Sequence, residues 1–317
     1  MRYLTVNNLK ISKNILGTTY FGTTTDRQTA FSLMDRFVSL GGNTIDTARS
    51  YANWLPNGES ASEKVIGEWM ESHRCRENLC LITKCAFPAE KGKSRLSREE
   101  ILGDLEQSLY CLKTNYVDIL FLHRDDETVP VFQIMPILDE AVRSKKVRVI
   151  GASNWTTERI SQANAFAKEQ GMTPFSVSEI QWSAAVSTPD AMQDDTLVCM
   201  NEHEYQWYLE NRFPVFAFSS QAKGIFSKAI TQGLEHLNEK IRTRFLNEQN
   251  IARIQWVKKY CEAHKVSPAT VILSYLNCNP VPAASIIGCS DLLQLEDSMH
   301  GADYLMSSED IRRLASI

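Results

Sequence analysis

The sequence of 317 residues has no long apolar run, since none approaches the ~18 residues of a membrane helix. Its first residues show no apolar segment after a basic start, so we expect no signal peptide and a cytoplasmic location. Positive charge is not in excess, because 34 Lys and Arg stand against 38 Asp and Glu. The net charge of −4 therefore predicts neither a nucleic acid nor a membrane as partner.

Metal-binding and disulfide patterns are also missing. The eight cysteines include no CxxC pair, and Cys75, Cys80 and Cys85 are spaced too widely for a usual zinc site. Residues 203–207 (HEYQW) lack the second histidine of HExxH. We expect no metal and no disulfide framework.

Short apolar runs recur along the whole chain, too short for helices and rich in Ile, Val, Leu and Phe. Several are apolar almost throughout, as strands buried on both faces should be. They predict eight strands, at residues 15–17, 44–47, 79–84, 117–123, 147–153, 176–181, 214–220 and 283–289.

Helical patterns fill the intervals between these runs. Ser97 with Glu100, and Ser60 with Glu63, each form the sequence pattern of a capping box at a helix start. Further helices are predicted near residues 27–40, 131–144, 157–170, 251–264 and 291–300. The alternation of strands and helices favours a parallel sheet.

Eight strand–helix units predict an α/β fold, the (β/α)8 or TIM barrel, in which ~250 residues are typical. The remaining residues are assigned to a short N-terminal β-hairpin around Asn7-Asn8, which would close the barrel floor, and to long loops after strands six and seven. These loops span residues 183–212 and 221–249. With no Pro/Gly/Ser-rich linker in the sequence, we expect one domain over residues 1–317.

Polar residues fall at the carboxyl ends of several predicted strands, where a barrel carries its chemistry. Asp46, Lys84 and His123 end strands two, three and four, and Tyr51 follows Asp46. Together they suit proton transfer, because a nearby Lys⁺ stabilises tyrosinate and lowers the tyrosine pKa. Structural alternatives remain at this point: Asp46 could cap a turn, Lys84 could extend from the rim, and His123 could belong to a solvated charged loop with Arg124.

The same segments resemble the aldo-keto reductase family along nearly the whole chain. The motifs are GNTIDTARSYANW, LITKCAF, VDILFLHRDD, VRVIGASNW, FAFSSQAKG and SIIGCSDLLQLEDSM. The resemblance implies an NADP(H)-dependent oxidoreductase that reduces aldehydes or ketones, with sugars or aryl compounds as possible substrates. It also implies a tetrad of Tyr51 as general acid, Lys84 and Asp46 as its support, and His123 at the substrate carbonyl.

The family pattern also implies which residues bind the cofactor. Ser153 and Asn154 would hold the carboxamide, and Asp46 would contribute as well. The remaining residues are Gly17, Thr18, Thr19, Glu179, Phe218, Ser219, Gln221, Lys223, Gly288, Ser290, Gln294 and Asp297. Since the family binds its cofactor on the barrel, a GxGxxG fingerprint is not expected.

Three departures from the family pattern affect these expectations. Glu179 stands where the family usually has Gln, and Phe218 where it usually has Tyr. The segment with Ser290 and Gln294 lacks the basic residue that suits a 2′-phosphate, although Lys223 and Lys228 could supply charge. NADP(H) is therefore expected, with NAD(H) as the alternative.

Aromatic residues near the predicted mouth suggest where a small carbonyl substrate binds. Tyr20, Trp54 and Trp155 are expected to line the substrate site together with His123. The chain is expected to be a monomer or a small homo-oligomer. Other functions stay open: a nicotinamide-binding redox sensor, an NAD(H)-dependent alcohol or sugar dehydrogenase, and a lyase or isomerase that uses Lys84 as a Schiff-base amine.

Overall fold

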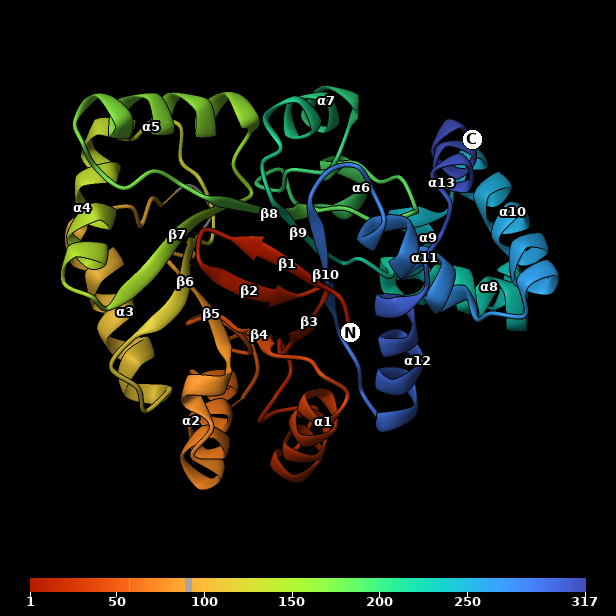
Figure 1. Cartoon of the computed structure of the whole chain (residues 1–317), viewed down its shortest axis with the longest axis horizontal. Coiled ribbons are helices and arrows are strands. Elements are labelled where there is room, and N and C mark those ends of the chain that lie inside the picture. Colours follow the sequence, from red (N-terminus) through yellow and green to blue (C-terminus); the bar gives the residue numbers. More distant parts are fainter. Residues whose placement is uncertain (57, 89–92) are drawn as a thin grey trace.

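A computed structural model describes residues 1–56, 58–88 and 93–317. Eight parallel strands close into a barrel in the order β10-β3-β4-β5-β6-β7-β8-β9 (Figure 1). The strands are β3 (Asn14–Gly17), β4 (Thr44–Asp46), β5 (Cys80–Cys85), β6 (Val117–Leu122), β7 (Val147–Ser153), β8 (Val177–Gln181), β9 (Val215–Phe218) and β10 (Ala283–Ile287). All eight predicted strands and the predicted (β/α)8 barrel are thereby confirmed.

The N-terminal hairpin consists of β1 (Tyr3–Val6) and β2 (Leu9–Ser12), which pair antiparallel. Val6, Leu9 and Ile11 are buried in one apolar cluster with inward-facing residues of the barrel strands, such as Ile119. The amide of Asn7 donates to Ser176 Oγ at 3.0 Å, just before β8 begins. The hairpin therefore closes the end of the barrel at which the strands start.

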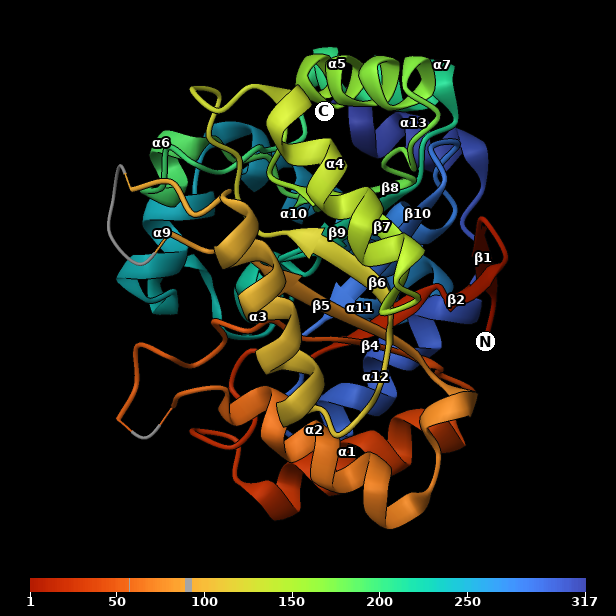
Figure 2. The same ribbon diagram turned by 90° about the vertical axis from the view of Figure 1, so that its left-hand side faces the viewer.

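Helices surround the barrel from α1 (Arg27–Ser39) onwards. The first half holds α2 (Ala61–His73), α3 (Arg98–Cys111), α4 (Val131–Arg143) and α5 (Thr157–Glu169). The connection after β8 carries α6 (Pro189–Met192) and α7 (Glu202–Asn211), and the one after β9 carries α8 (Ile225–Gln232), α9 (Glu239–Phe245), α10 (Glu248–His264) and α11 (Pro268–Asn277). The chain then forms α12 (Leu292–Asp303) and α13 (Ser308–Ser316), and Figure 2 shows α6 and α9 together on the side away from the hairpin.

The two predicted capping boxes behave differently. Ser97 accepts from the backbone N–H of Glu100 and caps α3, as predicted. Ser60 precedes α2 but has a left-handed backbone, with φ at 51°, and makes no side-chain cap. Its hydroxyl accepts from Arg49, and Glu63 is buried with its carboxylate on Thr83. The capping box at Ser60 was therefore wrong, because tertiary contacts use both side chains.

Helices α11 and α13 were not predicted from the sequence. Ser267 caps α11 by accepting from the N–H of Thr270, and Pro268 occupies its first turn. A serine followed by proline is a typical helix start, so this signal was present in the sequence. Most of α11 is buried, which hides the amphipathic pattern used to find the other helices.

Candidate active site

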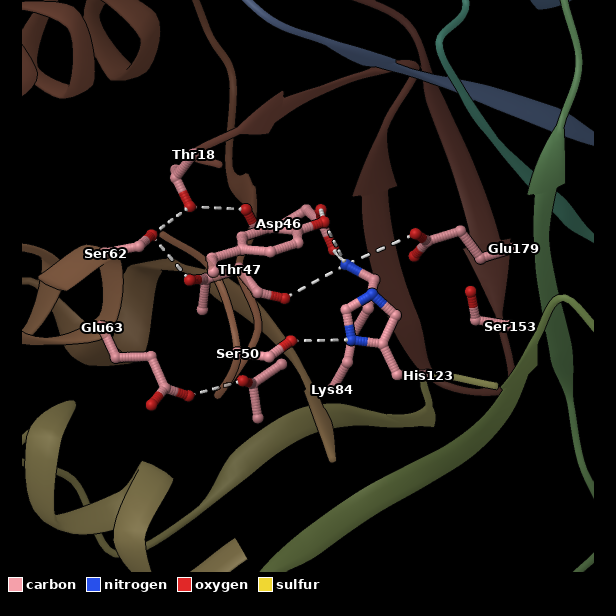
Figure 3. A network of polar contacts seen from close by, with 12 residues as sticks. Thr18, Asp46, Thr47, Ser50, Ser62, Glu63, Lys84, His123, Ser153 and Glu179 are labelled. Carbon is pink, nitrogen blue, oxygen red and sulfur yellow. Dashed lines mark hydrogen bonds and ion pairs between the residues drawn. The ribbon is translucent and has the colours of Figure 1, made fainter. Parts of the chain in front are cut away.

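Four polar side chains meet at the carboxyl ends of β4, β5 and β6 (Figure 3). The Lys84 ammonium forms a short ion pair with Asp46 Oδ1 and donates to the Tyr51 hydroxyl at 3.0 Å. It also donates to the carbonyl of Thr47 at 3.1 Å. Tyr51 donates to the other Asp46 oxygen at 3.2 Å. The structure therefore joins three of the four predicted catalytic residues in one hydrogen-bonded group.

His123 lies directly after β6, and its backbone N–H bonds to the carbonyl of Cys85. Its ring faces that of Tyr51 edge-on, with the centroids 5.8 Å apart. Nδ1 is 3.3 Å from the hydroxyl of Ser50, a contact that the sequence did not reveal. When Ser50 donates to Nδ1, the imidazole proton lies on Nε2.

Charge in this group is set by burial and by neighbouring residues. Burial alone would lower the pKa of Lys84, but the carboxylates of Asp46 and Glu179 outweigh it and raise the pKa far above its ordinary value. Burial, followed by the charge of Asp46, raises the pKa of Tyr51, while Lys84 acts in the opposite direction. Lys84 therefore lowers the Tyr51 pKa as predicted, but desolvation and the charge of Asp46 exceed this effect, so that the net shift is upward.

The pKa of His123 lies well below its ordinary value. Burial is the main cause, and the nearby charges of Arg124 and Lys84 add to it. His123 is therefore neutral at physiological pH and can donate one hydrogen bond.

A second layer of hydroxyl groups holds Asp46 in place. Thr18 Oγ1 donates to the backbone carbonyl of Asp46 at 2.8 Å and lies 2.7 Å from Ser62 Oγ. Both Thr18 and Asp46 are fully buried, and neither lines the cavity described below. The structure places Thr18 and Asp46 behind the lining of this cavity, and their expected cofactor contacts stay predictions.

The tetrad opens onto a cavity of about 1070 Å³ at the same end of the barrel. This exceeds the roughly 300–1,000 Å³ of common small-molecule pockets, which leaves room for a large ligand beside a substrate. The predicted site residues that line it are Gly17, Thr19, Tyr20, Tyr51, His123, Ser153, Asn154, Glu179, Phe218, Ser219, Gln221, Lys223, Gly288, Ser290, Gln294 and Asp297.

The predicted aromatic wall is smaller than expected. Trp155 is fully buried and packs edge-on against Phe175, so it cannot form a substrate wall. Trp54 is 57% exposed and does not line the cavity, but it meets the cavity residue Tyr20 edge-on at 6.4 Å. Only Tyr20, with Trp54 behind it, therefore provides an aromatic surface at this mouth among these predicted residues.

Glu179, which was expected beside the cofactor carboxamide, contacts a charged side chain. Its Oε1 lies 3.3 Å from Lys84, and its Oε2 is buried without a partner in the described part of the chain. Burial, followed by the charge of Asp46, raises the pKa of Glu179 to about 8. The neighbouring candidate Gln181 does not line the cavity, and its amide lies 3.5 Å from Ser183 Oγ.

Four cations gather beside the cavity in the connection after β9. Desolvation and the charges of Arg244, Lys240 and Lys228 lower the pKa of Lys223. Arg244 Nε is buried without a hydrogen-bond partner among the described residues. Uncompensated positive charge of this kind is suited to an anionic ligand.

Other cavity residues were not identified from the sequence. Arg124 follows His123 and was considered part of a solvated loop, but it lines the cavity and pairs with Asp194 at 3.3 Å. Ala269 and Ile272 reach the cavity from α11, one of the helices that were not predicted from the sequence. These residues come from loops and helices whose approach to the strands depends on the tertiary fold.

Comparison with known proteins agrees with this arrangement. The model of the aldo/keto reductase family matches residues 14–317. The chain belongs to the aldo/keto reductase family. Aldo/keto reductases are oxidoreductases that use nicotinamide cofactors, so the family resemblance noted from the sequence motifs is confirmed.

Three relatives show how much of its sequence this aldo/keto reductase shares with known proteins. Norsolorinic acid reductase stcV of Emericella nidulans is 28% identical over 96% of the chain and 77% of that protein. The uncharacterized oxidoreductase YrpG of Bacillus subtilis is 28% identical over 99% of the chain and 94% of that protein. Aryl-alcohol dehydrogenase [NADP(+)] of Phanerodontia chrysosporium is 31% identical over 56% of the chain and 47% of that protein.

Two other features are missing from the described residues of this aldo/keto reductase, a membrane-spanning helix and a metal site. None of its described helices is long and apolar enough to cross a membrane. Within residues 1–56, 58–88 and 93–317, no three His, Cys, Asp or Glu side chains are grouped to hold a metal ion.

Proposed function

We propose that this protein reduces aldehyde or ketone groups to alcohols with NADP(H), using Tyr51 as the general acid. The observation that carries the proposal is the position of Tyr51 and His123 on the cavity wall, with the Lys84–Asp46 pair hydrogen-bonded behind the tyrosine. A proton donor and a hydrogen-bond donor that face the same space can both reach one carbonyl oxygen.

Each residue has a distinct part in this reaction. The nicotinamide, when bound, supplies the hydride. Tyr51 gives its hydroxyl proton to the carbonyl oxygen, and the positive charge of Lys84 at 3.0 Å stabilises the tyrosinate that forms. Neutral His123 donates from Nε2 to the same oxygen and orients it. Asp46 keeps Lys84 charged and in place.

The cavity has groups that suit both ends of a nicotinamide dinucleotide. Ser153, Asn154 and the ring of Phe218 line the cavity together with Tyr51 and His123. The cations Lys223 and Lys228 line it as well, and neither forms an ion pair within the described residues. A 2′-phosphate adds negative charge, so this surplus favours NADP(H) over NAD(H) although the segment of Ser290 and Gln294 has no cation.

Aryl carbonyl compounds are the substrate class that we propose. The exposed rings of Tyr20 and Trp54, which meet edge-on, offer an apolar aromatic surface close to the cavity. The relative named aryl-alcohol dehydrogenase [NADP(+)] is consistent with an aryl substrate.

A Schiff-base lyase or isomerase is a weaker alternative. Such chemistry needs an uncharged amine that the substrate can reach. Lys84 is fully buried behind the cavity wall, and two carboxyl groups raise its pKa. A protonated, enclosed amine is a poor nucleophile, which also favours the reductase function.

The substitution Tyr51→Phe tests the proposal directly. Removing the hydroxyl should lower kcat for reduction of a nitrobenzaldehyde by NADPH at least about 100-fold, because general acid catalysis typically contributes ~10²–10⁴. The Kd for NADPH should stay within about threefold, since the ring and its packing remain. Fluorescence titration with NADPH and NADH, beside steady-state kinetics, measures both quantities and gives the cofactor preference.

Tyr110→Phe is the matched control, because Tyr110 is 79% exposed on α3 and should tolerate the same loss. A Tyr51→Phe variant that keeps most of its activity would refute the assignment of the general acid. Failure of the wild-type protein to bind either nicotinamide would refute the whole function.

A further inference from the structure

Lys84 lies between two carboxyl groups that come from different strands of the barrel (Figure 3). Asp46 at the end of β4 accepts from it on one side, and Glu179 in the middle of β8 lies 3.3 Å away on the other. Glu179 is 2% exposed and still lines the cavity. One oxygen of this buried acid therefore contacts the catalytic lysine, and the other has no partner among the described residues.

We propose that Glu179 is a positioning residue that makes the cavity discriminate between oxidised and reduced nicotinamide according to whether Glu179 carries a proton. This inference rests on the proposed function, because it requires the nicotinamide to bind beside Tyr51 and His123. It goes beyond that function because it assigns the Glu179 carboxyl a role that an amide at the same position could not have.

The argument is electrostatic. The oxidised nicotinamide ring carries a positive charge that the reduced ring lacks. An ionised carboxylate in a buried site stabilises that charge far more than it would in water, whereas a neutral carboxylic acid does so only weakly. By linkage, binding of the oxidised cofactor must then release a proton from Glu179, and its affinity must rise with pH. The reduced cofactor, without this charge, gains nothing from ionisation of Glu179.

The other charged groups around Glu179 do not change their protonation near neutral pH. Neighbouring strands contribute Ser153 and Phe216 opposite Glu179, and neither is titratable. The pKa values of Lys84 and Tyr51 lie above their ordinary values, and that of His123 lies well below its own.

Two further charges face the same space. Burial raises the pKa of Asp46, and its pair with Lys84 and its hydrogen bond from Tyr51 oppose that shift. Arg124 remains cationic and is paired with Asp194. Burial raises the pKa of Glu179 to about 8, so its carboxyl changes charge between neutral and mildly alkaline pH.

The test measures Kd for NADP⁺ and for NADPH by fluorescence titration at about pH 7 and about pH 9. In the wild-type protein the ratio of Kd for NADP⁺ to Kd for NADPH should fall about fivefold between the two, which is the part of a coupling of one pKa unit that falls within this pH range. In Glu179→Gln the ratio should change less than about twofold. Taking the ratio removes the titration of Lys223, which acts on the phosphates of both cofactors alike.

Glu63→Gln is the matched control, since Glu63 is another buried carboxyl with a raised pKa that does not line the cavity. It should keep the wild-type pH dependence of the ratio. Infrared difference spectra of the cofactor-free protein should show a loss of protonated carboxyl signal between pH 7 and 9 that is larger in Glu63→Gln, which keeps Glu179, than in Glu179→Gln, which keeps Glu63.

The possible outcomes separate this inference from the proposed function. Binding of both cofactors with a pH-independent ratio in the wild type would overturn the role of Glu179 and leave the reductase function in place. The same would follow from an unchanged pH dependence in Glu179→Gln. If neither cofactor binds the wild-type protein, the proposed function fails, and the inference fails with it.

Discussion

Several ionisable side chains of this protein are buried, and each is stabilised by the opposite charge of a neighbour. Lys84, Asp46 and Glu179 are all buried, and the charge of the lysine offsets that of the carboxylates. Leaving one buried charge of such a group without its partner typically costs about 3–5 kcal/mol, so each member constrains the others. This interdependence keeps the Lys84 ammonium within 3.0 Å of the Tyr51 hydroxyl before any ligand binds.

Glu63 is another buried carboxyl group, and it lies outside the cavity. It accepts from Thr83, next to Lys84 on β5, and burial raises its pKa from 4.5 to about 7. A raised carboxyl pKa means that the folded protein binds more protons than the unfolded chain between these values, so stability must fall as pH rises through this window.

We therefore expect Glu63→Gln to remove part of the pH dependence of folding. Between about pH 5 and pH 8 the wild-type free energy of unfolding should fall by up to about 3 kcal/mol more than that of the variant, since one pKa unit corresponds to about 1.36 kcal/mol. Urea unfolding at both pH values measures the difference. Equal losses in the two proteins would show that Glu63 ionises normally in the folded state.

At the scale of elements, close approach between helices depends on single glycines. A Cβ on Gly67 in α2 would lie 2.3 Å from the carbonyl oxygen of Cys111 at the end of α3. A Cβ on Gly103, in α3 itself, would meet nothing within 4 Å. The same substitution should therefore have opposite effects at the two positions.

Gly67→Ala should destabilise the fold by roughly 1–3 kcal/mol, because the backbone of α2 must shift away from α3. Gly103→Ala should be neutral or stabilising by up to about 1 kcal/mol, because alanine favours a helix and the site is open. Chemical denaturation of both variants gives the two signs. A loss of stability in Gly103→Ala equal to that in Gly67→Ala would contradict the packing explanation.

Sequence patterns identified elements well where the pattern has a local cause. The eight strands and the cap at Ser97 follow from burial and from contacts within four residues. Ser60 shows the same cap pattern and failed, since Arg49 takes its hydroxyl across the loop. The net rise of the Tyr51 pKa was not predicted, because the size of the desolvation effect cannot be read from residue types.

The cavity residues show the same difference between residues that a sequence pattern predicts and residues that only the tertiary fold brings to the cavity. Residues at strand ends, such as Ser153 and Ser219, were found because the barrel places all strand ends at one mouth. Trp155 also follows a strand end, but it turns into the protein against Phe175. Arg124 and the α11 residue Ile272 reach the cavity only through tertiary packing, so their spacing in the sequence carries no signal.

In the whole molecule, the hairpin that helps to stabilise the barrel and the residues of the candidate active site lie at opposite ends of the barrel. The hairpin β1–β2 fills the end where the strands start, and the tetrad and cavity lie where they finish. Ile11 is fully buried in the cluster that closes the first end. A change at Ile11 should therefore alter folding without reaching Tyr51 or His123.

We expect Ile11→Ala to lower the free energy of unfolding by about 2–5 kcal/mol, as for other large-to-small changes in a core. At a temperature where the variant is still folded, its kcat/KM per folded molecule should stay within about twofold of the wild type. Urea unfolding and kinetics on the same preparation compare the two quantities. A proportionate loss of kcat/KM would mean that the barrel floor and mouth are coupled, because packing at one end would then set the distances of the Lys84–Asp46–Tyr51 group at the other.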